Sequence, residues 1–330
     1  MDGCLRRNAL DRRHALAAFT ALALSPLARG QGRAAPRVAV LCFGSPGNLK
    51  SRMDAFLAGM RQLGYVDGRN VRYDTQYANG QRDLLRGLAR EVVAPDPAVI
   101  VSGSTLVTPA LIEATRTIPI VMVTAEEALA TTRQPTRPAP NVTGTVNNAL
   151  EQVPRTLAHL VAAVRGLTRV AALVNPSNAA HAPYRGAIES AARAARVRCD
   201  FVEAPAKPDI QRAVERAASL AQALMVMSDA DFYDERRNIA ELMMVNRIPA
   251  IFPQRGYVDA GGLMSYGYNA EQGFARAADF VDRILKGAKA ADVPLEWPAK
   301  AEFVINRYVA TNLGIKIPPE VLKRADRVVG

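Results

Sequence analysis

Histidine and cysteine are scarce in this chain, with three of each among 330 residues. No two of them have the spacing of metal ligands, so the sequence predicts no metal site. Cys42 and Cys199 lie far apart in strand-like runs. This placement favours buried free thiols over a disulfide framework, although a disulfide stays open in an oxidising compartment.

The motifs of common enzyme classes are also missing. The chain has no Gly-x-Ser-x-Gly elbow, no Gly-x-x-x-x-Gly-Lys phosphate loop and no Gly-x-Gly-x-x-Gly fingerprint. His159 falls on an amphipathic helix and is predicted to be a surface residue, while His181 lies in a loop without an evident partner. We therefore expect a protein that is not an enzyme and needs no cofactor.

The net charge is +11, but no basic run with interleaved aromatic residues occurs. The arginines are scattered over helical faces, as at Arg193 and Arg196. Solvated helix faces explain this pattern, and no nucleic-acid partner is expected.

Long apolar runs are absent as well, and the longest near the start spans only residues 15–24. This run is about half the length of a membrane-spanning helix. It follows Arg12 and Arg13 and precedes small residues around Ala28, which is the pattern of an export signal. We expect cleavage after residue 30, export to the periplasm by the Sec or twin-arginine route, and a mature chain without a transmembrane span. The leader has five arginines and two aspartates, so the mature chain keeps a charge of +8.

Apolar β-rich runs then alternate with amphipathic helical runs, which is typical of parallel α/β sheets. The predicted helices include residues 49–63, 82–93, 104–115, 153–163, 184–195, 210–220, 232–245 and 271–286. The predicted strands are residues 38–43, 71–77, 98–102, 118–124, 170–174, 198–202, 224–227, 250–252, 263–268 and 303–306. Because ten strands would make an unusually wide sheet, the sequence predicts two Rossmann-like lobes.

Ligands of open α/β sheets bind beyond the carboxyl ends of the strands. In the first half, the polar residues at such ends are Ser45, Ser102, Ser104, Thr105 and Thr124. The hydroxyls and free amides of 102–105 suit an anionic group such as a carboxylate. An N-cap at Ser104 is the plainer alternative.

The second half supplies a matching set of candidates. Asp229 could pair with a ligand ammonium group or cap the helix expected near residue 232. One face of strand 263–268 could form a wall of the site or pack in the core. The ligand-binding candidates of this half are Asn175, Asn178, Asp229, Phe252, Tyr266 and Tyr268.

Several short motifs resemble one family when they are taken in order. They are Asn-Val-Thr-Gly-Thr at 141–145, Ser-Asp at 228–229, Ile-Pro-Ala at 248–250, Gly-Leu-Met-Ser-Tyr-Gly at 262–267, Ile-Leu-Lys-Gly at 284–287 and Val-Ile-Asn at 304–306. Their order and spacing resemble the ABC-transporter substrate-binding proteins related to tryptophan-binding TrpX. The similarity covers nearly the whole mature chain.

The resemblance implies a type I periplasmic binding protein fold, with two lobes joined by three crossovers near 143–145, 261–268 and 295–300. The N-terminal lobe would comprise 36–143 and 265–296, and the C-terminal lobe 144–264 and 297–330. It implies a monomer that clamps a small molecule between its lobes and delivers it to an ABC permease in the inner membrane.

The ligand stays open, because relatives often carry an Asp-Pro pair after the strand corresponding to 118–124. Here the residues are Ala125, Glu126, Glu127 and Ala128. An amino acid or a related small carboxylate or aromatic compound is expected. An exported ligand-sensing module for a membrane receptor and an α/β enzyme are the alternative functions.

Overall fold

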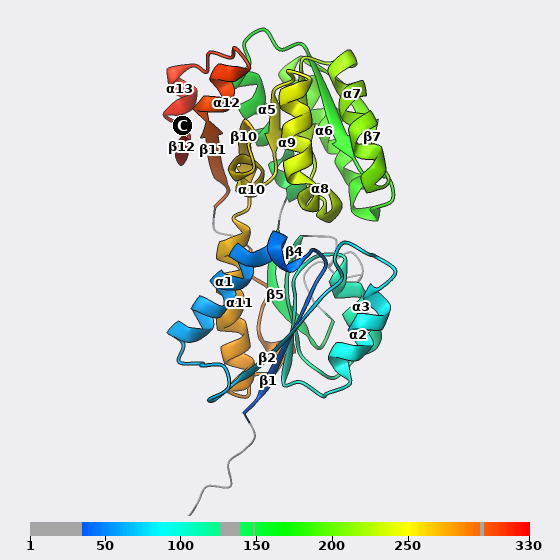
Figure 1. Cartoon of the computed structure of the whole chain (residues 1–330), viewed down its shortest axis with the longest axis vertical. Helices are drawn as coiled ribbons and strands as arrows, with labels where there is room; N and C mark the ends of the chain where they lie inside the picture. The colour runs from blue at the N-terminus through cyan, green and yellow to red at the C-terminus, as the bar shows by residue number, and fades with distance from the viewer. Residues whose placement is uncertain (1–34, 126–138, 148, 298–299) are drawn as a thin grey trace, which may run out of the picture. The chain divides into compact units, whose positions relative to one another are not determined.

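The first sheet has five parallel strands in the order β2-β1-β3-β4-β5 (Figure 1). The structure is a computed structural model that describes residues 35–125, 139–147, 149–297 and 300–330. The predicted leader and residues 126–128 lie outside the described residues. The strands are β1 (Arg37–Cys42), β2 (Arg72–Tyr77), β3 (Val99–Ser102), β4 (Ile120–Ala125) and β5 (Val142–Asn147).

Both faces of this sheet are covered by helices, because its central strands are apolar throughout. Side chains alternate along β1, so Val38 and Val40 pack in the cluster that includes α1 and α11, whereas Ala39 and Leu41 pack with α2 and α3. Figure 1 shows these two helix pairs on opposite sides of the sheet. Their bounds are α1 (Pro46–Gln62), α11 (Ala270–Leu285), α2 (Leu85–Val93) and α3 (Val107–Ala114).

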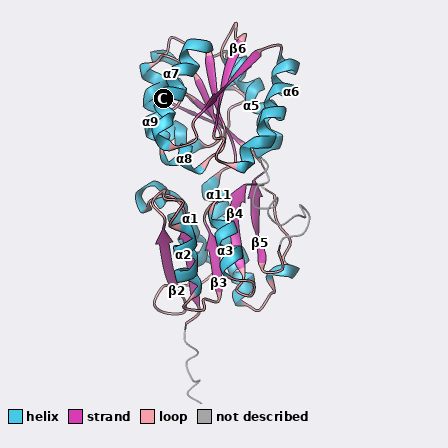
Figure 2. Cartoon of the chain, turned by 90° about the vertical axis from the view of Figure 1, so that its right-hand side faces the viewer, coloured by secondary structure: helices cyan, strands magenta, loops and turns pink. Residues whose placement is uncertain are grey.

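The second sheet, drawn in magenta in Figure 2 with helices on both of its faces, has the order β12-β11-β10-β9-β8-β6-β7, and only the β10–β11 pair is antiparallel. Its strands are β6 (Arg169–Val174), β7 (Arg198–Glu203), β8 (Ala223–Val226), β9 (Ala250–Phe252), β10 (Met264–Gly267), β11 (Glu302–Asn306) and β12 (Arg327–Val329). Two parallel-dominated sheets confirm the predicted fold class.

Helices also cover both faces of the second sheet. Val170 and Ala172 of β6 pack with α5 and α6, and Ala171 and Leu173 pack with α7 and α9. The bounds are α5 (Ala149–Ala163), α6 (Ala182–Ala195), α7 (Ile210–Leu220), α8 (Ala230–Asp234), α9 (Arg236–Val245), α10 (Arg255–Asp259), α12 (Arg307–Asn312) and α13 (Pro319–Leu322). The helix predicted at 232–245 is therefore two helices, α8 and α9.

Strand β5 occupies residues 143–145, where the family resemblance implied a crossover. Gly144 has φ +130°, and a Cβ there would lie 2.2 Å from the Met122 carbonyl oxygen of β4. Only glycine allows the two backbones to approach this closely. The hydrophobic pattern of so short a polar strand was too weak to predict it.

The lobe boundaries stay a proposal. The expected boundaries at 143/144 and 264/265 would divide strands β5 and β10, so we place both boundaries after these strands. β5 continues to Asn147 in the first sheet, and β10 continues to Gly267 in the second. Helix α11 then packs on α1, β3, β4 and β5. We propose that the chain crosses between lobes after the end of β5, between β10 and α11, and between Glu296, which bridges to β5, and the start of β11.

Helix α1 approaches α11 closely at Gly59, where a Cβ would lie 2.9 Å from the Ala275 carbonyl oxygen and 2.9 Å from the Ala278 Cβ. We expect Gly59→Ala to lower the free energy of unfolding by about 1–3 kcal/mol, because backbone atoms must move. Gly186→Ala on α6 is the control, since nothing lies within 4 Å of its Cβ position. It should raise stability by about 0.5–1 kcal/mol. Urea unfolding measures the free energy of unfolding of both variants. Equal changes of the same sign would contradict the claim that the close contact between α1 and α11 requires glycine at position 59.

Candidate functional site

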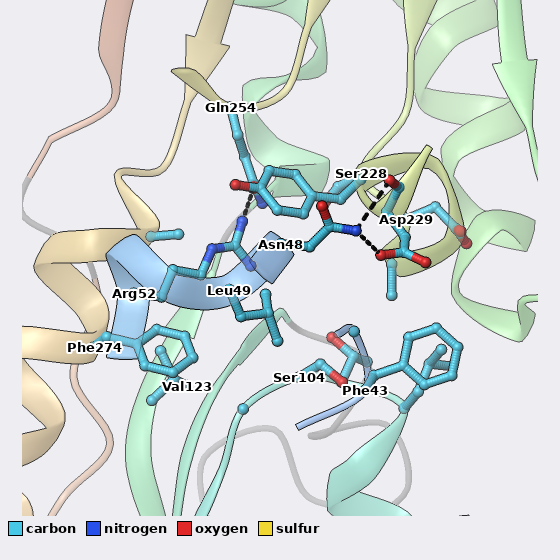
Figure 3. Close-up of a pocket in the computed structure, with 18 of the residues that line it drawn as sticks. Phe43, Asn48, Leu49, Arg52, Ser104, Val123, Ser228, Asp229, Gln254 and Phe274 are labelled. Carbon is cyan, nitrogen blue, oxygen red and sulfur yellow. Dashed lines mark hydrogen bonds between the residues drawn. The ribbon is translucent and has the colours of Figure 1, made fainter. Parts of the chain in front are cut away.

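A cavity lies where residues after β1 and β3 of the first sheet meet residues after β8 and β9 of the second (Figure 3). It encloses about 840 Å³ of empty space, including space open to solvent. We call it the main cavity. Both sheets contribute the carboxyl ends of parallel strands, which is where ligands of open α/β sheets bind.

Five of the predicted ligand-binding residues line the main cavity. They are Ser104, Thr105, Asn178, Asp229 and Tyr268. The hydroxyl of Ser104 is buried and has no hydrogen-bond partner among the described residues. Helix α3 begins at Val107, and no side chain caps it, so Ser104 is not the N-cap that the plainer alternative expected.

Three other predicted ligand-binding residues, Ser45, Ser102 and Phe252, do not line the main cavity. Ser45 caps α1 by accepting from the Asn48 amide at 3.4 Å, and Ser102 shares a 2.8 Å hydrogen bond with Thr108. Phe252 is fully buried and stacks on Tyr257, with ring centres 4.7 Å apart. Thr124 belongs to β4, and its side chain lies outside what the structure describes.

Tyr266 packs against aromatic rings rather than on the main cavity. The His159 ring lies 4.6 Å from Tyr266 and 4.0 Å from Phe303, measured between ring centres. Burial lowers the pKa of His159. His159 is half-buried and stays partly exposed, and the helical pattern did not reveal the rings of β10 and β11 that pack on it.

Asp229 is both a helix cap and part of a buried network. Its Oδ1 accepts from the backbone amides of Asp231 (2.8 Å) and Phe232 (3.3 Å), which caps α8 as the alternative predicted. Its Oδ2 accepts from the side-chain amides of Asn175 (3.2 Å) and Asn178 (2.9 Å). Asn175 is fully buried behind Asp229 and does not line the main cavity. The carboxylate is thus a fixed negative charge at the cavity edge.

His181 has the partners that the sequence did not reveal. Its Nδ1 accepts from the Asn175 backbone amide at 3.0 Å, so the proton of the neutral ring lies on Nε2, 3.0 Å from the Ser228 carbonyl oxygen. The Asp229 Oδ2 atom lies 3.5 Å from Nε2. Burial lowers the pKa of His181, and the nearby Asp229 opposes this shift only in part.

The lowered pKa of His181 predicts a loss of stability in acid. The unfolded chain, with a histidine pKa near 6.5, takes up the proton before the folded chain does. His181 therefore stabilises the fold fully above that value, and its contribution falls as the pH drops below it. We expect the difference in free energy of unfolding between the native protein and His181→Gln to narrow from pH 7.5 to 5. Urea titrations across this range test the sign, and a difference that widens in acid would contradict it.

Arg52 of α1 lines the main cavity and was missed in the sequence analysis. Its side chain is buried, with the residue 8% exposed, and its Nη2 donates to Gln254 Oε1 at 2.6 Å (Figure 3). The guanidinium lies over the Tyr233 ring, 3.8 Å from its centre, while Nε has no hydrogen-bond partner in the described part of the chain. No described carboxylate forms an ion pair with it. Burial of an unpaired charge is costly, so this position suits an anionic ligand group.

The acidic residues of α8 are neutralised, in contrast to Arg52. Asp231 pairs with Arg82 at 2.7 Å, and Asp234 pairs with Lys207 and accepts from the Asn48 side-chain amide. Arg82 and Asn48 follow strands of the first sheet, so these contacts join the two halves beside the cavity. Arg52 is therefore the cavity-lining cation that has no acidic partner among the described residues.

The remaining wall of the main cavity is apolar and aromatic. Phe43, Tyr233, Tyr268 and Phe274 line it together with Leu49, Val123 and other aliphatic residues. In the described residues, no group of three His, Cys, Asp or Glu is placed to hold a metal ion. The cavity combines the Arg52 cation, the hydrogen-bonded carboxylate of Asp229, the ion-paired Asp234, neutral hydrogen-bonding groups and aromatic rings, which suits a small organic compound with a carboxylate.

The missed residues carried a detectable signal. Along α1, Leu49, Met53, Phe56 and Met60 form the buried stripe, and Arg52 lies within that stripe. An arginine at an apolar helical position predicts either a buried ion pair or a ligand contact. Gln254 was not missed in the same way, because it lies just beyond the carboxyl end of β9, among the strand-end positions where ligand contacts are expected.

Comparisons with known proteins identify a family and relatives that are similar to this chain. Residues 37–329 match the family model described as ABC transporter substrate binding protein. A tyrosine-binding protein of Clostridioides difficile is 22% identical over 261 residues, which are 78% of this chain and 75% of that protein.

Two solved structures share the fold. A conserved domain protein from Vibrio cholerae has a TM-score of 0.82 and 24% identity, covering 89% of this chain and 99% of the other. An ABC domain from Streptococcus pneumonia in complex with L-Trp has a TM-score of 0.81 and 24% identity, with the same coverage. Both support the predicted type I periplasmic binding protein fold.

The family has a defined role in transport. Its members bind a small molecule outside the cytoplasmic membrane and deliver it to an ABC permease, and they are classed as binding proteins rather than enzymes. Within the described residues, no helix has the length and apolar character to cross a membrane. This chain belongs to the family of ABC transporter substrate-binding proteins.

Proposed function

We propose that this protein binds a free amino acid with an apolar or aromatic side chain and presents it to its permease. The observation that carries the proposal is the buried, unpaired guanidinium of Arg52 in the main cavity. A ligand carboxylate would neutralise this charge and could accept from Nε, which no described residue satisfies. The tyrosine-binding relative and the L-Trp complex of the structural neighbour support the same ligand class.

The ligand's ammonium group would lie toward Asp229. This carboxylate is held by four protein donors, so its position is fixed before the ligand arrives. A fixed charge costs no reorganisation when the ligand binds. Asn178 and the unpaired Ser104 hydroxyl would complete the polar contacts.

Uptake would proceed by hinge closure around the three proposed crossings. Contacts between the halves, such as the Arg82–Asp231 ion pair, would stabilise the closed form. The protein would act as a monomer in the periplasm after removal of residues 1–30. Delivery to the permease would then follow from recognition of the closed form.

The test is to identify the natural ligand and to measure its binding. Compounds released from the purified native protein by mild denaturation would be identified by mass spectrometry. Thermal unfolding would then be followed with the twenty amino acids, aromatic carboxylates and the corresponding amines. We expect apolar or aromatic amino acids to raise the Tm, because a ligand that binds only the folded state stabilises it.

Two outcomes would change the proposal. An aromatic acid without an ammonium group, bound as tightly as the amino acid, would remove Asp229 from its proposed role. Stabilisation by amines but not by acids would contradict the assignment of Arg52 and with it the proposed ligand class.

A further inference from the structure

A second cavity adjoins the main cavity on the side of the second sheet. It encloses about 340 Å³ of empty space, part of it open to solvent, and it shares Ser228 and Tyr268 with the main cavity. Its other walls come from α5, from Tyr184 of α6, from the end of β8, and from Pro253 and Tyr266. The residues proposed to bind the charged groups of the ligand, such as Arg52 and Asp229, do not line this second cavity.

The second cavity is suited to an apolar group. Val153, Met227 and Tyr184 are buried in its wall, with exposed fractions of 3%, 3% and 4%. None of the described residues that line it carries a charge. The Thr156 hydroxyl already donates to the Gln152 carbonyl oxygen at 3.0 Å. A charged end of a ligand would lose its hydration here without compensation, whereas an aliphatic or aromatic group would not.

The shared wall between the two cavities is held in place by packing. A Cβ at Gly273 of α11 would lie 1.3 Å from the hydroxyl oxygen of Tyr268, so this hydroxyl fills the space beside the glycine. Tyr268 is therefore a fixed partition at the junction rather than a free side chain. Ser228 is the other residue that lines both cavities, so the two spaces meet at Tyr268 and Ser228.

We propose that the second cavity receives the apolar side chain of the amino acid whose carboxylate binds Arg52, and that Ala149, Val153 and Met227 set the length of the side chain accepted. This inference rests on the proposed function. In this proposal, residues of α1 and the N-terminus of α8 bind the charged groups of the ligand. Residues of α5 and the end of β8 contact its side chain and limit the size that is accepted.

The test changes the size of the second cavity and measures affinity by isothermal titration. Ala149→Leu adds volume at the cavity wall, and Ala162→Leu is the matched control, since it is equally half-buried on the same helix but lines neither cavity. The probe is the amino acid that raises the Tm of the native protein most. We expect Ala149→Leu to weaken its binding about tenfold or more, and Ala162→Leu to leave it unchanged.

A second variant removes volume instead of adding it, so its effect on binding cannot come from overpacking of the cavity wall. Val153→Ala enlarges the cavity and should shift preference from leucine toward tryptophan. The proposal is overturned if Ala149→Leu folds and binds the probe as the native protein does, or if the preferred amino acid is glycine or alanine. If the native protein binds none of the amino acids, the proposed function fails first, and the two failures are thereby distinguished.

Discussion

Replacement of Arg52 with glutamine is expected to weaken ligand binding about 100-fold, which corresponds to about 2.7 kcal/mol. A charge-assisted hydrogen bond to a carboxylate contributes about 1.5–3 kcal/mol, and glutamine can donate only as a neutral amide. The same change should leave the stability of the ligand-free protein nearly unchanged, because the loss of the Gln254 hydrogen bond and of the contact with the Tyr233 ring is offset by the removal of a buried charge. Arg52 is buried without an acidic partner among the described residues, so its removal also removes a desolvation penalty.

A large loss of ligand affinity without a loss of stability would identify Arg52 as a ligand contact, whereas a structural residue would lose stability. Arg61→Gln is the matched control, because Arg61 lies exposed in the last turn of the same helix. Isothermal titration and thermal unfolding would be measured for both variants. If Arg52→Gln lost stability and kept its affinity for the ligand, Arg52 would be a structural residue and the site would need another anchor.

Asp229→Ala should lower the free energy of unfolding by about 3 kcal/mol or more. The change removes the N-cap of α8, worth about 1 kcal/mol. It also leaves the buried side-chain amide of Asn175 without its acceptor, which costs about 1–3 kcal/mol, and removes the acceptor of the half-buried Asn178 amide. The network around Asp229 therefore has more effect on stability than a cap alone.

Asn306→Ala is the control variant that removes a helix N-cap without removing a buried amide network like that of Asp229. Asn306 caps α12 by accepting from the Val309 amide at 3.1 Å. Its replacement should cost about 1 kcal/mol. Urea unfolding of both variants gives the comparison, and equal losses would show that the amide network of Asp229 contributes nothing measurable.

Much of the fold could be predicted from the sequence because the central strands are continuous apolar runs. β1, β3, β6 and β8 are buried on both faces, and each is followed by an amphipathic helix. β5 and β12 could not be predicted in this way. β5 is short and polar, and it depends on the close approach of Gly144 to β4, while β12 is an exposed strand of three residues at the sheet edge.

The site was only partly predictable, because strand ends locate the region but not the side chains that face it. Ser104 and Asp229 were predicted from their positions after β3 and β8, and both line the main cavity. Ser102 sits beside Ser104, yet its hydroxyl points to Thr108 instead. Arg52 and Tyr233 come from helices, and their contact across the two halves depends on tertiary packing that no local pattern contains.

The central claim is that Arg52 recognises the carboxylate of the ligand, and one binding cycle tests it directly. The affinities of the preferred amino acid and of its carboxamide would be measured by isothermal titration for the native protein and for Arg52→Gln. We predict that the native protein prefers the acid by about 100-fold and that the variant loses this preference. A preference for the acid that persists unchanged in Arg52→Gln would contradict the claim.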